Sequence, residues 1–167
     1  MIPDIKLGWM AGVIDLKGRF LRKHNKQRAT PQIILSVESK EIAVIQELGV
    51  LTGLKADAKK PQPVRDFMRR GCSEHCPHAH THVGEVPVEN LYLPAIARWT
   101  VTGAGMVVIV SNLLPYLIID RDYVRIMEEV MGNTPITGQG SGMVATSLRR
   151  LSLLGWTLPQ QYEKVLE

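Results

Sequence analysis

Six cysteine and histidine side chains lie within the eleven residues from Cys72 to His82, in a segment with few apolar residues to order it. Thiolates and imidazoles are the ligands that Zn²⁺ takes in four-coordinate structural sites. The expected ligands are Cys72, Cys76, His80 and His82, with His78 and His75 as alternates. The pattern predicts a structural zinc ion that orders this loop, because a catalytic zinc would also need a base and an open position.

A carboxylate and a lysine end the first apolar segment of the chain. Lys17 directly precedes Gly18, Asp15 lies three positions before Gly18, and an alternating, basic stretch begins at Arg19. A helix that delivers a carboxylate close to a glycine, and then continues into a basic strand, favours a metal or phosphate site. The basic stretch holds six cationic or imidazole side chains and no acid, namely Arg19, Arg22, Lys23, His24, Lys26 and Arg28. By themselves these side chains predict either a solvated strand or a strand that contacts phosphate groups.

The elements that position these residues follow from hydrophobic periodicity. Apolar residues recur with a helical period from Ile42 to Leu51 and alternate with polar ones from Thr30 to Glu38. We expect helices at 5–16, from 41 until Gly53, and at 103–114, 122–131, 144–154 and 158–166, with strands at 19–25, 30–38, 54–59 and 95–101. This order predicts an α+β fold in which 60–94 is an irregular insertion.

Met10 to Gly18 resembles the LAGLIDADG motif of the homing endonuclease family, and Phe20 follows it as in that family. The segments at 99–101, 106–114, 115–117 and 126–127 resemble the second half of the same domain, so the resemblance covers roughly residues 5–130. It implies an αββαββα domain with a curved antiparallel sheet that lies in the DNA major groove. It also implies a homodimer joined through the first helix, with Trp9, Ala11 and Gly12 at the interface.

The resemblance also implies a catalytic site from which this chain departs. In active members the acid directly before the final glycine coordinates Mg²⁺, but here that position is Lys17, and Asp120 stands where the family commonly has a lysine. A charged ammonium cannot ligate a metal ion. One interpretation is that Lys17 and Asp120 form an ion pair and that cleavage is lost, with Asp15 a structural residue. The other is that Asp120, with or without Asp15, holds Mg²⁺, so that the chain hydrolyses phosphodiesters as a DNA endonuclease.

If Gly18 sets the phase of the strands, one face of the sheet carries polar and cationic side chains that can read base edges and reach phosphates. Its members are Arg19, Leu21, Lys23, Asn25, Thr30, Gln32, Ile34 and Ser36. Together with the resemblance, this face predicts sequence-specific binding of double-stranded DNA; the alternative is a sheet face that is simply exposed to solvent. A third interpretation, from another class, is a zinc-stabilised protein-interaction module that does not bind DNA.

Length and composition set the remaining bounds. The 167 residues, with 45% hydrophobic residues and a net charge of +4, predict one domain at 1–131 followed by a linker and helical tail at 132–167. The apolar run from Met106 to Ile119 is interrupted by Ser111, Asn112 and Pro115, so we expect no membrane span. The N-terminus has no signal-peptide pattern, and two cysteines do not form a disulfide framework, which together predict an intracellular protein.

Overall fold

Four antiparallel strands form the main sheet of the computed structural model, in the order β1-β2-β6-β3. They are β1 Gly18–Lys23, β2 Gln32–Ser39, β3 Ala56–Lys59 and β6 Ile96–Thr102. The structure describes residues 1–24, 31–59, 62–63, 92–93, 96–119, 122–133 and 141–166. A second sheet pairs two short strands, β4 Gln62–Pro63 and β5 Tyr92–Leu93. The described parts therefore contain each strand expected from the sequence, with ends shifted by a few residues.

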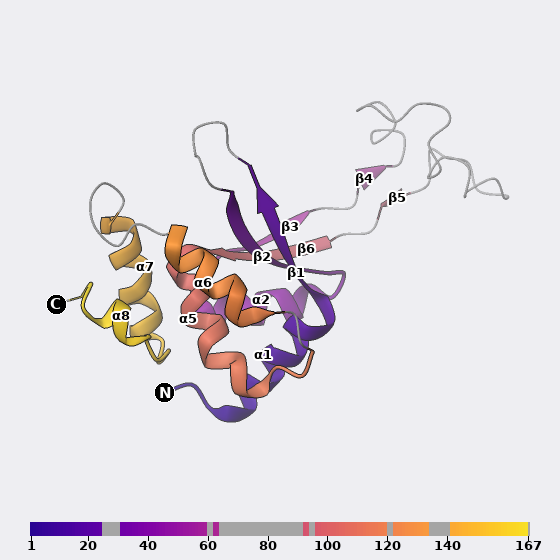
Figure 1. The fold of residues 1–167 in the computed structure, drawn as a ribbon. Helices are drawn as coiled ribbons and strands as arrows, with labels where there is room; N and C mark the ends of the chain where they lie inside the picture. The colour runs from indigo at the N-terminus through magenta and orange to yellow at the C-terminus, as the bar shows by residue number, and fades with distance from the viewer. Residues whose placement is uncertain are drawn as a thin grey trace, which may run out of the picture.

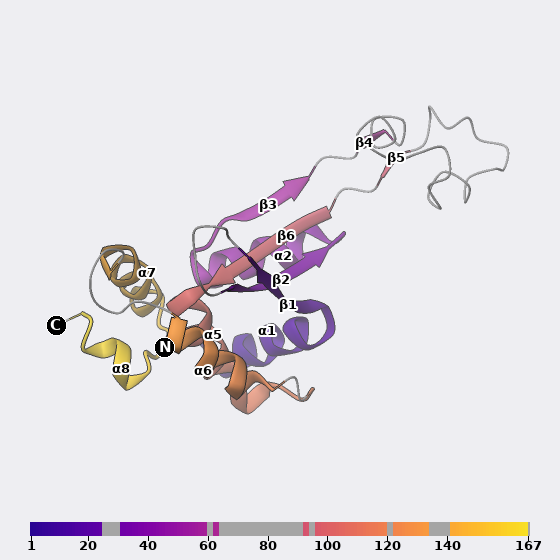
Figure 2. The same cartoon turned by 45° about the horizontal axis from the view of Figure 1, so that its top comes forward.

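The helices gather on one side of the sheet, as Figure 1 shows. They are α1 Asp4–Lys17, α2 Ile42–Thr52, α5 Gly103–Leu113, α6 Tyr123–Asn133, α7 Ser141–Leu153 and α8 Gln160–Glu163, with a 3₁₀ turn, η2, at Leu114–Tyr116. Figure 2 shows α1, α5 and α6 along one flank of the sheet and α2 beneath β6. The other face of the four strands carries no helix among the described residues, so the fold is a mixed α+β layer with one open sheet face.

Alternation along the strands explains which face the helices cover. In β2 the side chains of Ile33, Leu35 and Val37 are buried, and in β6 those of Ala97, Trp99 and Val101 are buried. Because successive side chains of a strand point to opposite faces, these residues share the helix-covered face. α5 fills the centre of the core, since most of its residues are buried.

Two sequence features end the helices where the periodicity predicted. α2 is followed by Gly53 in the left-handed conformation at φ 64°, which glycine adopts without a steric cost. α5 gives way to the turn η2, in which Pro115 lacks the N–H that a continuing α-helix needs.

The C-terminal helices α7 and α8 add to the same core. Leu148, Leu151, Trp156 and Tyr162 belong to one buried cluster with the residues of α5. The Trp156 indole N–H donates to the Leu51 carbonyl oxygen at 2.9 Å, which ties this segment to α2. The described residues from 141 onward thus pack on the main domain, and the division proposed at residue 131 stays a prediction. Among all described residues, no helix has the length and apolarity that crossing a membrane requires.

Candidate nucleic-acid interface

The open face of the sheet carries the side chains that the strand phase selects. Antiparallel pairing sets Arg19 opposite Ser36, Leu21 opposite Ile34 and Lys23 opposite Gln32. Arg19, Leu21 and Lys23 are exposed, while Phe20, between them, packs against the core. The structure therefore brings these six residues to one face, as the alternation predicts. Asn25 and Thr30, which were expected on the same face, lie outside the described residues.

Strand β6 extends this face with residues that the sequence analysis did not single out. Thr102 pairs with Ile34, Thr100 with Ser36, and Arg98 with Glu38. The Arg98 guanidinium also forms an ion pair with the Glu38 carboxylate. The signal was present in the sequence, because Arg98, Thr100 and Thr102 alternate with the buried residues of β6.

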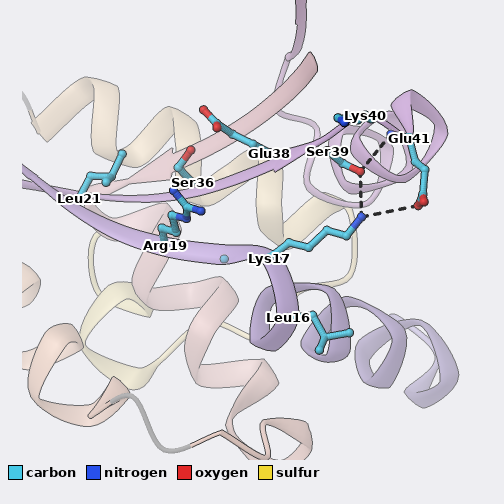
Figure 3. A pocket seen from close by; sticks show the side chains of 10 residues that line it. Leu16, Lys17, Arg19, Leu21, Ser36, Glu38, Ser39, Lys40 and Glu41 are labelled. Atoms are coloured by element: carbon cyan, nitrogen blue, oxygen red, sulfur yellow. Dashed lines mark hydrogen bonds and ion pairs between the residues drawn. The ribbon is translucent and has the colours of Figure 1, made fainter. Parts of the chain in front are cut away.

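A concave site of about 570 Å³ opens where α1 ends and β1 begins. Figure 3 shows its lining, which α1, β1, β2 and the turn after β2 supply: Leu16, Lys17, Gly18, Arg19, Leu21, Ser36, Glu38, Ser39, Lys40 and Glu41. Within it the Lys17 ammonium donates to the Ser39 hydroxyl at 3.0 Å and lies 3.6 Å from the Glu41 carboxylate. The site is continuous with the open sheet face, because Arg19, Leu21, Ser36 and Glu38 belong to both.

Gly18 makes the abrupt step from helix to strand sterically feasible. A Cβ atom at this position would lie 2.4 Å from the Ile14 carbonyl oxygen, well inside contact distance. The φ angle of Gly18 is −72°, which any residue can adopt. Glycine is therefore required here because the backbone of Ile14 lies so close, and not because the position needs a left-handed conformation.

The side chain of Asp15 joins the end of α1 to the segment that precedes α6. Its side chain is only 5% exposed. The Oδ2 atom accepts hydrogen bonds from the backbone N–H groups of Ile118 and Ile119, at 2.7 and 3.3 Å. The Oδ1 atom accepts from the Tyr123 hydroxyl at 2.9 Å. The carboxylate therefore fastens the segment between η2 and α6 to the end of α1.

The expected catalytic residues do not assemble a metal site in the described part of the chain. The side chain of Asp15 contacts the segment before α6, whereas that of Lys17 contacts Ser39 and Glu41. No group of three or more His, Cys, Asp or Glu residues is arranged to hold a metal ion among the described residues. Asp120 and the cluster from Cys72 to His82 lie outside them, so the Lys17–Asp120 ion pair and the zinc site stay predictions. At the place of the expected metal ligand, the Lys17 ammonium repels a cation.

The face of α1 that could meet a second copy differs from the expected one. Ala11 is fully buried in the core of its own chain, so it does not lie on the surface. Ile5 and Leu16 are 82% and 79% exposed, Trp9 is also exposed, and a Cβ atom at Gly12 would meet nothing within 4 Å. These four residues recur at helical spacing and define the exposed apolar face of α1.

No protein-family model matches the chain, and no curated protein matches it at a significant level. Among solved structures, the chain is similar to the homing endonuclease I-CvuI in complex with its target in the presence of Ca, at 12% identity over 90% of this chain and 80% of that chain, with a TM-score of 0.46. A second structure, of I-CvuI in complex with the I-CreI target in the presence of Mg, matches at 12% identity over 91% and 81%, with a TM-score of 0.47. Values this low do not establish a family for the chain.

Proposed function

We propose that this chain is a sequence-specific double-stranded DNA-binding protein, of LAGLIDADG type, that binds its target as a homodimer and has lost metal-dependent cleavage. The observation that carries the proposal is the open sheet face, on which Arg19 and Lys23 are exposed and the amide of Gln32 stands opposite Lys23. Cations position a protein on phosphates, and amide and guanidinium groups read base edges in the major groove. The resemblance of residues 10–18 to the LAGLIDADG motif also supports DNA binding.

Loss of cleavage is supported by the neighbours of Asp15 and Lys17. The carboxylate that survives from the motif is bonded to Ile118, Ile119 and Tyr123, and the lysine occupies the position where a metal ligand is expected. Phosphoryl transfer requires charges placed within a fraction of an ångström, which a lysine at the ligand position does not provide.

Dimerisation is proposed through the exposed apolar face of α1, which consists of Ile5, Trp9, Gly12 and Leu16. The open space around Gly12 lets another helix backbone approach closely, and large apolar side chains flank it on either side. A two-fold dimer would present two copies of the sheet face to two half-sites of a pseudo-palindromic duplex.

A structural zinc ion bound by Cys72, Cys76, His80 and His82 completes the proposal, on the strength of the ligand types and their density in the sequence. Its role would be to order the insertion between β4 and β5. Metal analysis of the purified chain tests it directly.

Selection of bound duplexes from a random DNA pool, followed by incubation of the winners with Mg²⁺ or Mn²⁺, tests the function. We expect enrichment of a pseudo-palindromic sequence that is bound and left intact. Cleavage of the selected DNA would favour an active site that uses Asp120. Enrichment of no sequence would refute DNA recognition and favour a protein-interaction module.

Two arginines of β1 provide a matched pair of variants for the same assay. Arg19 lies on the open face, whereas Arg22 forms an ion pair at 2.6 Å with Glu129 of α6. Arg19→Ala should weaken binding and reduce its salt dependence by about one unit of slope for each DNA phosphate that is no longer neutralised. Arg22→Ala removes the same charge from the same strand and should leave DNA affinity within about twofold of the wild type. Equal reductions in affinity would show that net charge, and not the open face, determines binding.

A further inference from the structure

The concave site between α1 and β2 holds an excess of positive charge. Its cations are Lys17, Arg19 and Lys40, and its acids are Glu38 and Glu41. The charge of Glu38 is offset by its ion pair with Arg98, outside the site. Arg19 and Lys40 form no ion pair with any residue that the structure describes. An anion entering this site therefore meets a net attraction.

A buried hydroxyl in the same site lacks a partner. Ser36 is only 3% exposed, and its Oγ atom makes no hydrogen bond within the described part of the chain. Pairing sets it directly opposite Arg19, and Figure 3 shows the two side chains next to each other at the edge of the site. Buried hydroxyls are nearly always hydrogen-bonded in native proteins. An anionic oxygen bound beside Arg19 would accept the proton that Ser36 has available.

The Lys17 ammonium is held in place at this site. It comes from the last residue of α1, where the helix dipole favours a cation. Contacts with the Ser39 hydroxyl and the Glu41 carboxylate direct it toward the end of β2 and the turn that follows, away from Arg19 and Ser36 (Figure 3). An ammonium has three N–H donors, so after these two contacts one donor is left for an anion. The side chain is 38% exposed, which leaves it accessible from solvent.

We infer that Lys17 is a built-in cation that replaces a divalent metal ion at this place and binds the DNA backbone, while Arg19 and Ser36 bind a neighbouring phosphate group at the other end of the site. The inference rests on the proposed function for the source of the phosphate. The resembled motif predicts Mg²⁺ at this place, but the residue at the ligand position is Lys17, whose ammonium repels Mg²⁺. The inference follows from this disagreement. A cation that is covalently part of the chain is present whether or not metal is available, so binding should not depend on divalent ions.

The test measures the affinity of the full chain for a selected duplex over a range of salt concentrations, with Mg²⁺ or with EDTA. The wild type should bind equally well in both. Lys17→Ala should bind more weakly in both and lower the salt slope by about two per dimer, one for each copy. Lys17→Asp should bind weakly in EDTA and recover part of its affinity in Mg²⁺. The control is Lys6→Ala, which removes a cation of the same helix that pairs with Glu47, away from the site.

A wild type that needs Mg²⁺ for affinity, or a Lys17→Ala variant whose slope matches that of Lys6→Ala, would overturn the inference. A second measurement separates this failure from failure of the proposed function. Inorganic phosphate, titrated into the protein and followed by NMR shifts of the Ser39 and Glu41 amides beside the Lys17 ammonium, should saturate in the wild type and in Lys6→Ala but not in Lys17→Ala. If no duplex is selected and phosphate still saturates, the anion site stands and DNA recognition fails. Absence of any phosphate-dependent shift refutes the site itself.

Discussion

Replacing Tyr123 with phenylalanine should destabilise the fold, because it removes the hydroxyl that donates to the buried carboxylate of Asp15 at 2.9 Å. The ring would be retained, and with it the edge-to-face contact with Phe20 at 5.6 Å between ring centroids. A hydrogen bond to a charged group contributes about 1.5–3 kcal/mol to the free energy of unfolding. For a chain of this length, removing that contribution corresponds to a fall of about 3–12 °C in Tm. Thermal and urea unfolding followed by circular dichroism measure it.

Tyr162→Phe is the matched control for this prediction. The Tyr162 hydroxyl is also buried, but among the described residues only the Gln161 side chain lies near it, and the two do not meet the geometry of a hydrogen bond. Removing it eliminates an unsatisfied polar group, so the free energy of unfolding should stay level or rise by about 1 kcal/mol. A double-mutant cycle of Tyr123→Phe with Asp15→Asn should give a coupling energy of about 1 kcal/mol or more. Equal effects of the two tyrosine substitutions, or a coupling energy of zero, would refute the anchoring role of Asp15.

Four further predictions address packing, assembly, pH and metal. Gly18→Ala should destabilise the chain by several kcal/mol, because its Cβ would lie 2.4 Å from a carbonyl oxygen, whereas Gly12→Ala should not destabilise the monomer; urea unfolding compares them. Leu16→Glu should convert a dimer to monomers in analytical ultracentrifugation, with its secondary structure unchanged. Burial raises the pKa of Tyr162 above its ordinary value of 10.0. The free energy of unfolding should therefore keep this contribution below pH 10 and fall as the pH rises above 10, because ionisation is less favourable in the folded chain. Over the same pH interval, the free energy of unfolding of Tyr162→Phe should fall less. The purified chain should contain one zinc per protomer, and Cys72→Ser should lower that content.

Local pattern was sufficient to predict most of the elements and one face of the sheet. In strand β2 the apolar residues Ile33, Leu35 and Val37 lie two apart, so their burial on one face could be predicted before any pairing was known, whereas the burial of Ser36 could not. The same alternation placed Arg19 and Ser36 on the opposite face. Glycine and proline marked the ends of α2 and α5, because their backbone chemistry acts locally.

Features that depend on which segments meet in space could not be predicted in this way. Lys17 contacts Ser39, at the end of β2, and Glu41, in the turn after it. Only the fold brings these two residues to the end of α1. Ala11 was expected at a dimer interface, but a small residue on an apolar helix serves close packing within its own core equally well. The helical period of α7 likewise does not say that Leu148 is buried against the main domain.

The measurement that tests the central claim most directly is the affinity of the full chain for the selected duplex compared with a scrambled duplex of equal length and composition. Both should be titrated over the same range of salt. Sequence-specific recognition predicts a selected-to-scrambled ratio of about 10³ or more, together with a steep fall in both affinities as salt rises. Equal affinities for the two duplexes, or an affinity that does not change with salt, would contradict the claim that the open sheet face reads DNA.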